Sequence, residues 1–181
     1  PDEYKLFWEN FGPVIKEGLY EDFENRETIQ KIVRFHSTTG GDDLVSLEEY
    51  VGRMKEGQDT IYYISGEDLD AVRHSPQLEG FVAKGIEVLL LTDAVDDFWI
   101  PSVGEYDGKP FKSATRAGAD LDKISADTAD DSEAEDEKSF DDGKVDSLIA
   151  MFRLTLNEEV KDVRVSERLT DSAVCLVSDE G

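Results

Sequence analysis

Apolar residues recur every three or four positions in the first part of the chain, and this spacing predicts helices. The apolar positions of residues 2–20 that share one helical face are Phe7, Phe11, Val14 and Ile15. The Gly12-Pro13 pair lies inside this stretch and should kink or break the helix. Residues 25–36 show similar spacing and should form a second helix. A capping box, in which Ser46 and Glu49 bond each other's backbone N–H groups, should begin a third.

The pattern then changes to short apolar runs that are typical of strands. Thr60 to Ile64 is rich in β-branched and aromatic residues. Ile86 to Leu91 is almost entirely apolar, as expected for a strand that is buried on both faces. Helical turns are predicted between them at residues 67–74 and 77–84, and Gly85 should end the second. Strand, helical crossover and strand make a βαβ unit, whose two strands should be parallel.

The residues after this unit predict a short helix and a further strand. Residues 95–103 should form a short helix or irregular turn that is limited by Pro101. Asp107-Gly108 is a turn sequence. Lys109 to Thr115 has the composition of a strand that begins at Pro110, and because proline cannot donate a ladder hydrogen bond we expect an edge strand.

A strongly acidic segment, residues 117–142, separates two parts of the chain. It holds eleven carboxylates against two lysines, with Leu121, Ile124 and Phe140 as its only large apolar residues. Such a segment buries too little apolar surface to offset the entropy of ordering it. We therefore interpret it as a linker.

A second unit is predicted over residues 143–181. Its helical stripe consists of Val145, Leu148, Ile149 and Phe152, and strands are expected at 163–166 and 173–177. This is too little for a complete core, so we expect an incomplete α+β unit. The predicted fold class is thus α/β: a helical coil, then a small α/β/α layer with a parallel βαβ unit, then the incomplete unit.

The charge and the apolar content of the chain exclude some classes of partner. The chain carries 43 acidic and 19 basic residues, a net charge of −24. A surface this acidic repels nucleic acid and anionic membranes, so we expect neither as a partner. No apolar run approaches the roughly 18 residues that a membrane helix needs. The first residues are acidic and do not resemble a signal peptide. The single Cys175 is flanked by apolar residues, so we interpret it as a buried structural thiol. Both observations favour a location in the cytoplasm.

Motifs that would carry catalysis are weak. Residues 40–43, Gly-Gly-Asp-Asp, resemble a carboxylate signature for metal ions, but they join two predicted helices and are better explained as a loop. His36 and His74 have no Cys or second His at ligand spacing, so we assign no metal, catalytic or cofactor-binding residue. An α/β enzyme with unrecognised carboxylate chemistry stays open as an alternative, because carboxylates are plentiful and no pocket selects a pair.

The adjacent rings of Phe98 and Trp99 are the clearest candidate for binding. Two neighbouring residues cannot both face one narrow core stripe on a helix, so one ring should be partly exposed. An exposed ring here would offer an apolar contact to a partner protein. The competing interpretation is that both rings pack inside the domain.

Several long motifs resemble the ninety-kilodalton heat-shock chaperone family, most closely in its bacterial form. The motifs that carry the resemblance, in the family's order, are Phe7-Trp8-Glu9-Asn10-Phe11-Gly12, Ser46-Leu47-Glu48-Glu49-Tyr50-Val51, Arg53-Met54-Lys55-Glu56-Gly57-Gln58, Ile61-Tyr62-Tyr63-Ile64, Gly85-Ile86-Glu87-Val88-Leu89-Leu90-Leu91, Glu105-Tyr106-Asp107-Gly108-Lys109-Pro110-Phe111 and Arg168-Leu169-Thr170-Asp171. They extend over nearly the whole chain.

The resemblance implies a domain organisation. Residues 1–116 would be the later part of the family's middle domain, with a helical coil over 1–58 and a small α/β subdomain over 59–116. Residues 143–181 would begin the C-terminal domain. The ATP pocket with its Mg²⁺, the arginine that reaches the γ-phosphate and the helices that form the homodimer would lie outside these residues, so the chain itself is not expected to be an enzyme.

The resemblance also implies a role in protein folding and the stress response. Bacterial members bind partly unfolded client proteins near the junction of the middle and C-terminal domains, through an aromatic residue that the match places at Phe98, beside Trp99. We expect client contact and coupling between domains from this chain. The alternative is an acidic interaction module without chaperone activity, whose binding would vanish at modest salt because exposed charges are screened.

Overall fold

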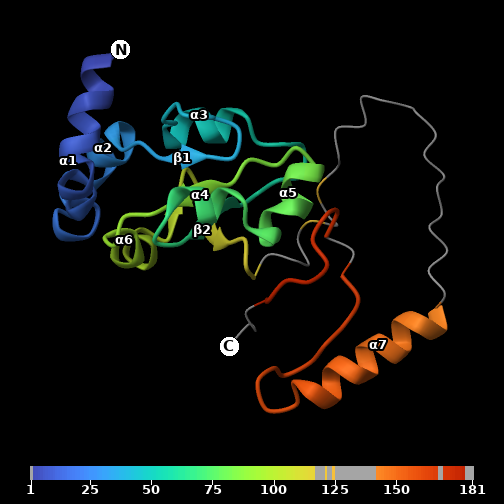
Figure 1. Ribbon diagram of the computed structural model, residues 1–181. Helices are drawn as coiled ribbons and strands as arrows, with labels where there is room; N and C mark the ends of the chain where they lie inside the picture. Colours follow the sequence, from blue (N-terminus) through green and yellow to red (C-terminus); the bar gives the residue numbers. More distant parts are fainter. Residues whose placement is uncertain (1, 117–120, 122–123, 125–141, 167–168, 178–181) are drawn as a thin grey trace. The chain divides into compact units, whose positions relative to one another are not determined.

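The computed structural model describes residues 2–116, 121, 124, 142–166 and 169–177 (Figure 1). Its contacts divide the chain into two units. The first comprises Pro1–Asp127 with Arg168–Gly181, and the second comprises Thr128–Glu167. The two units are described separately. The first contains the sheet and carries every side chain discussed below as a candidate site.

Helix α1 spans Asp2–Glu21 and runs without a break through Pro13. The predicted break was therefore wrong. Proline removes one N–H donor, but the helix is stabilised because Trp8, Lys16 and Leu19 are buried against the rest of the first unit. Gly12 permits this packing, because a Cβ atom there would lie 2.8 Å from the Trp8 ring.

The buried face of α1 is not the one that the sequence predicts. Of the predicted stripe, Phe7, Phe11 and Val14 are exposed and Ile15 packs partly against the core. The face one-quarter turn away, which carries Trp8 and Leu19, is buried instead. Both faces are apolar enough to form a core stripe. Periodicity shows that the helix has such stripes, and only the shape and polarity of the neighbouring elements select between them.

The two helices predicted next both form and are shorter than predicted, and a two-residue strand that was not predicted lies between them. Helix α2 covers Arg26–Ile32, strand β1 covers His36–Ser37, and helix α3 covers Leu47–Gly52. The capping box is confirmed: the Ser46 N–H donates to Glu49 Oε2 at 2.7 Å, and the Glu49 N–H donates to Ser46 Oγ at 3.1 Å. Residues 33–35 leave the helix because Phe35 forms a β-bridge with Val45.

The sheet has five strands in the order β1-β3-β2-β5-β4. Strand β2 covers Ile61–Ser65, β3 Leu89–Leu91, β4 Glu105–Tyr106 and β5 Lys109–Ser113. The predicted parallel βαβ unit is confirmed, since β2 and β3 pair in parallel. Its crossover contains α4 (Leu69–Arg73), the 3-10 helix η1 (Pro76–Leu78) and α5 (Glu79–Ala83), and Gly85 follows with a φ of 64°.

Strand β5 is not the edge strand that Pro110 predicts. It pairs with β2 on one side and with the two-residue β4 on the other. Asp107 and Gly108 both have positive φ and form a tight turn that folds β4 back onto β5. The missing proline donor is tolerated because the next N–H, that of Phe111, donates to the Gly104 carbonyl at 3.0 Å.

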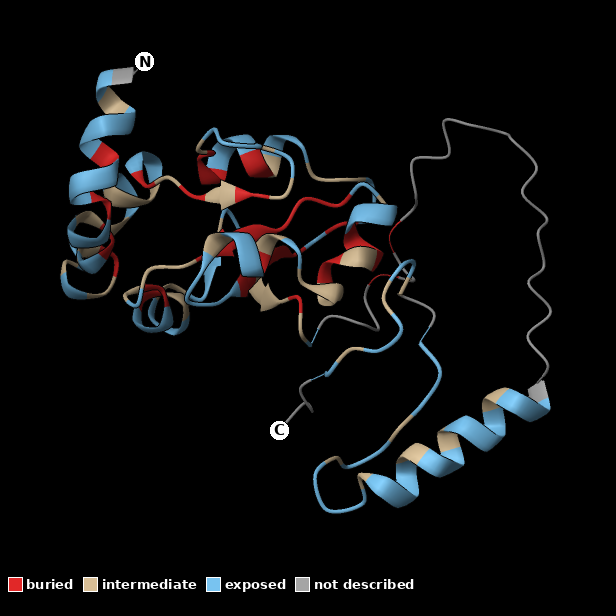
Figure 2. Ribbon diagram, viewed as in Figure 1, coloured by how far each residue is buried: buried red, intermediate tan, exposed pale blue. Residues whose placement is uncertain are grey.

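Helices cover both faces of the sheet, and this confirms the α/β class. One core cluster lies on the side of α4 and α5, where Tyr62, Ile64 and Leu90 point. The other lies on the side of α1, α3 and α6 (Asp96–Val103), where Ile61 and Leu89 point. Figure 2 shows these buried residues concentrated along the strands. Leu121 and Ile124, from the predicted acidic linker, belong to the first cluster, while most of that linker lies outside the described residues.

The second unit contributes helix α7, which spans Asp142–Thr155. None of its described residues between 143 and 166 is buried. The strand predicted at 163–166 in this unit and the one predicted at 173–177, which belongs to the first unit, do not form: these residues are irregular in the structure. An alternating pattern becomes a strand only when another strand supplies its hydrogen bonds, and no partner strand is present among the described residues near them.

Candidate functional site

Helix α6 turns its two adjacent rings in opposite directions. Trp99 is 1% exposed and Phe98 is 63% exposed. The Trp99 ring packs against Phe35 and, edge-on, against Phe111, with ring centroids 5.5 and 5.3 Å apart. Trp99 is therefore a core residue and cannot touch a partner directly. The prediction of partner contact by Phe98 and Trp99 is corrected to Phe98 alone, and its function stays a prediction.

Phe98 lies beside the half-buried ring of Tyr20 near the end of α1. Its ring centroid is 6.0 Å from that of Tyr20. Phe23, just after α1, is also exposed, and the Arg26 guanidinium stacks 4.4 Å from its ring centre. Arg26, the first residue of α2, also donates to Ser102 Oγ of α6 at 3.0 Å and to the Leu19 carbonyl of α1 at 2.7 Å, so it links α1 to α6. We refer to Tyr20, Phe23 and Phe98 as the α1–α6 aromatic surface.

Negative charge borders this surface. Asp97 precedes Phe98 and is exposed. Desolvation, and then the carboxylates of Glu21 and Glu17, raise the pKa of Tyr20, so its hydroxyl stays protonated at neutral pH. Rings with acidic neighbours can contact apolar side chains and still repel another copy of this acidic chain.

A buried ionic network anchors α6 to α1. The Lys16 ammonium lies 2.7 Å from Asp93 Oδ2 and 2.9 Å from Asp96 Oδ1, and Lys16 and Asp96 are almost fully buried. The Trp99 indole N–H donates to the same Asp96 Oδ1 at 2.6 Å. The Lys16 ammonium also lies 4.9 Å from the centre of the Phe35 ring. One lysine from α1 thereby fixes the carboxylate that fixes Trp99.

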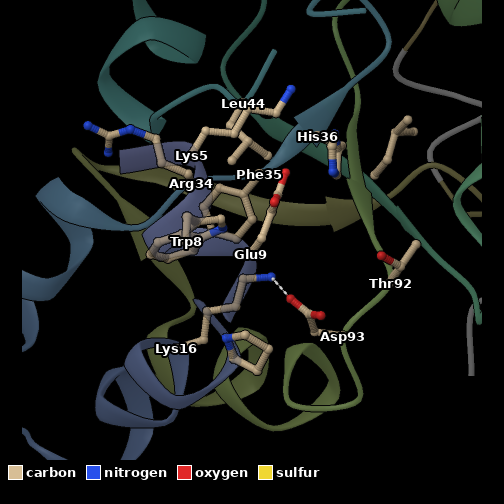
Figure 3. Close-up of a pocket in the computed structure, with 12 residues that line it drawn as sticks. Lys5, Trp8, Glu9, Lys16, Arg34, Phe35, His36, Leu44, Thr92 and Asp93 are labelled. Carbon is tan, nitrogen blue, oxygen red and sulfur yellow. Dashed lines mark hydrogen bonds and ion pairs between the residues drawn. The ribbon is translucent and has the colours of Figure 1, made fainter. Parts of the chain in front are cut away.

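A cavity of about 140 Å³ opens beside this network. Figure 3 shows its lining, which includes Lys5, Glu9, Arg34 and His36 around Phe35, with the Lys16–Asp93 pair at its lower end. The cations already have partners: Lys5 donates to the Asp42 carbonyl, and Arg34 donates to the carbonyls of Lys31 and Val33. These carbonyls are neutral, so Lys5 and Arg34 keep their positive charge, but a ligand would have to compete with the carbonyls for the N–H donors.

His36 is the unusual group in this cavity. Its Nδ1 is buried and has no hydrogen-bond partner. Burial lowers its pKa, and the positive charges of Arg73, Lys16 and Lys5 lower it further. His36 is thus neutral at pH 7. Among the residues that the structure describes, no group of three or more His, Cys, Asp or Glu side chains is arranged to hold a metal ion.

The remaining candidates have structural explanations. Residues 40–43 form a loop between β1 and α3, with Asp42 and Asp43 exposed, as the turn chemistry predicts. His74 is exposed, and its Nδ1 lies 2.7 Å from the Asp70 carbonyl oxygen at the end of α4. Cys175 is half-buried rather than buried, which corrects the prediction of a buried thiol. Its expected strand does not form, so the apolar neighbours on which that prediction depended do not enclose it.

Sequence reasoning missed Lys16 and Asp96. Lys16 lies in the same turn as Ile15 and Leu19, both of which contact the core, and a lysine at such a position signals a buried ion pair. Asp96 stands three residues before Trp99, which places the carboxylate one turn from the indole. The partner of each residue lies about 80 positions away in the sequence, so no local pattern could join them.

Comparison with known proteins agrees with this architecture. The chain superposes on the middle domain of a putative heat shock protein from Plasmodium falciparum with a TM-score of 0.60 and 37% sequence identity, over 65% of this chain and 49% of that one. The superposed part of the chain therefore has the fold of part of a heat shock protein middle domain. The model of the Hsp90 protein family matches residues 1–181. The chain belongs to the Hsp90 family.

Bacterial relatives match over the full length of the chain. It is 56% identical to the chaperone protein HtpG of Roseobacter denitrificans over 100% of the chain, and 54% identical to the chaperone protein HtpG of Paramagnetospirillum magneticum over 99%. The chain spans 28% of the length of each of these relatives. In the part of the chain that the structure describes, no helix combines the length and apolarity needed to cross a membrane.

Proposed function

We propose that this chain is a segment of an ATP-dependent molecular chaperone that assists protein folding under stress, and that its α1–α6 aromatic surface contacts partly unfolded client proteins. The observation that carries the proposal is the exposed Phe98 ring on a helix whose next residue, Trp99, is buried. Family membership and the HtpG relatives support the chaperone role. The proposal places the whole protein in the cytoplasm, with ATP and Mg²⁺ as cofactors and a homodimer as its assembly.

The geometry suits transient contact with unfolded chains. Tyr20 of α1, Phe23 of the turn after it and Phe98 of α6 carry the rings. Aromatic side chains contribute strongly to protein contacts because they bury a large area with few rotatable bonds. The rings do not form a deep pocket, so they impose little selectivity on side-chain shape. Such a surface fits a client that presents varied apolar segments.

The same segment would also couple its neighbours mechanically. Helix α1 packs against α6 within the first unit. The buried ion pairs of Lys16 with Asp93 and Asp96 join the two helices. We assign no step of ATP hydrolysis to this segment. Client contact and coupling, rather than chemistry, are the roles that we propose for it.

The decisive test measures client affinity after the exposed ring is removed. A fluorescein-labelled, reduced and carboxymethylated α-lactalbumin, which stays unfolded, would be titrated with the chain and with Phe98→Ala at low and at roughly physiological salt. We expect Phe98→Ala to weaken binding about tenfold, in the range of an interface residue of real importance. Val82→Ala is the matched control, because Val82 is 60% exposed on α5, on the opposite face of the sheet.

The salt series separates this proposal from the alternative. Apolar contact should persist when salt is raised. Binding that disappears at physiological salt, and is equal for Phe98→Ala and the unsubstituted chain, would instead indicate an acidic interaction module, as the net charge of −24 allows.

A further inference from the structure

Four groups meet at the buried contact between α1 and α6. Lys16 is 3% exposed, and its ammonium bonds both Asp93 and Asp96. Asp96 accepts from Lys16, from the Trp99 indole and from the Asp93 backbone N–H, at 2.9, 2.6 and 3.1 Å. The Asp96 carboxylate therefore has donors on both oxygens, and the buried charge of Lys16 is balanced.

We infer that Lys16 is a positioning residue for client contact, which holds α6 in the rotation that keeps Trp99 inside and Phe98 outside. The inference rests on the proposed function, since it concerns the same surface. Lys16 does not reach the surface itself. It acts through Asp96, and Asp96 acts through the indole of Trp99.

Helix α6 depends on such an anchor because its own sequence stabilises it weakly. It has eight residues, contains Pro101 and begins after Val95, whose side chain makes no capping bond. Isolated helices shorter than about 12 residues are marginal in water, so tertiary contacts must decide the placement of α6. Arg26 holds its C-terminal end through Ser102, and Lys16 holds its first turn.

Removing the Lys16 charge would favour a rotated helix. Without its ammonium, Asp96 would be a buried carboxylate beside the carboxylate of Asp93, which strongly disfavours the buried position. Asp96 can regain hydration by turning toward solvent. Neighbouring residues on a helix are about 100° apart, so this rotation would carry Phe98 away from Tyr20 and disturb Trp99.

The test compares Lys16→Met, Phe98→Ala and the double variant in the full chain. Methionine keeps the length and apolar stem of lysine but removes its charge. Affinity for the labelled, carboxymethylated α-lactalbumin is measured at physiological salt, and Trp99 emission is recorded in a Trp8→Phe background. Arg53→Met is the matched control, because it breaks a second pair with a buried carboxylate, Arg53–Glu87 at 2.9 Å, just after α3.

We expect Lys16→Met to weaken client binding about tenfold and to shift Trp99 emission. We expect no further loss of affinity when it is added to Phe98→Ala, because the effects of substitutions at residues that act as one unit are not additive. Arg53→Met should leave affinity unchanged. A residue that only stabilises the fold would give equal effects in Lys16→Met and Arg53→Met, or would add to Phe98→Ala, and either result would overturn the inference.

The outcomes also separate this inference from the proposed function. Normal affinity in Lys16→Met with weakened affinity in Phe98→Ala overturns the positioning role and leaves the contact surface standing. Normal affinity in Phe98→Ala overturns both. If Lys16→Met does not fold, Asp93→Asn replaces it, since Asp93 is partly exposed; a shifted Trp99 emission with unchanged affinity would then count against the inference.

Discussion

Helices α6 and α7 both expose large apolar residues, but for different reasons. Helix α6 has eight residues and is fixed by the buried Trp99 and Asp96, so the exposed Phe98 is presented at a set place. Helix α7 has fourteen residues, and none of the side chains described on it is buried; Leu154 is 83% exposed. The shorter helix is the better anchored one.

The comparison shows how an exposed apolar residue should be interpreted. On α6, a core beneath the helix fixes its position while Phe98 remains in solvent, which is the arrangement that a contact surface needs. On α7, exposure follows from the lack of any buried anchor among the described residues of its unit. Hydrophobic spacing predicts a helical stripe for α7, yet α7 is the helix without a buried side chain among its described residues.

The largest effect should come from removing the anchor of α6. Trp99→Ala would leave a cavity between Phe35 and Phe111 and should destabilise the first unit by about 3–5 kcal/mol. Chemical denaturation followed by circular dichroism measures this change. Phe98→Ala on the same helix is the control, and a loss of similar size for both substitutions would contradict the difference between the two rings.

A smaller effect is expected when the anchoring charge is removed but the shape is kept. Asp96→Asn leaves Lys16 with Asp93 as its only carboxylate partner and should cost about 3 kcal/mol, because a buried pair that loses one member is strongly destabilised. Denaturant titration of Asp96→Asn beside Asp97→Asn would show it. Asp97 is exposed, so equal stability of the two variants would mean that the network contributes little.

Helix α3 offers an intermediate case, anchored by a local cap as well as by burial. Ser46→Ala removes the cap and should cost about 1 kcal/mol. The bonds from Ser46 lower the pKa of Glu49. This contribution is therefore present above the unfolded pKa of about 4.3 and is lost as pH falls through the lower folded value. Alanine keeps the backbone N–H of residue 46 and loses only the side-chain bonds, so melting curves at neutral and acidic pH should show the difference between the two chains narrow in acid. A constant difference would exclude a contribution from the Glu49 carboxylate.

The smallest effect is expected on α7. Leu154→Ala should change stability by less than about 0.5 kcal/mol, since the side chain is exposed and alanine favours helices at least as well as leucine. Leu90→Ala is the matched control, because Leu90 is 2% exposed in the sheet and should cost about 3 kcal/mol. A clear loss in Leu154→Ala would show that α7 has a buried contact after all.

The order of the elements could be predicted from the sequence because local chemistry fixes it. The Ser46–Glu49 capping box, the helix stop at Gly85 and the parallel βαβ unit each depend on residues close together in the chain. Of the candidate surface, the pattern pointed to the Phe98-Trp99 pair, and the family resemblance pointed to Phe98 in particular. Tyr20 and Phe23 were not anticipated, because nothing local distinguishes a ring that ends beside α6.

The sequence by itself therefore determined most helices of the first unit and the strands β2, β3 and β5, since spacing, caps and turns act over a few residues, while the short strands β1 and β4 were not predicted. Only the tertiary structure decided that α1 buries Trp8 and Leu19 rather than Phe7 and Phe11, that β5 lies inside the sheet, and that Lys16 meets Asp96. The physical reason is that burial depends on the surface that an element packs against. That surface is formed by residues far away in the chain, which local periodicity does not describe.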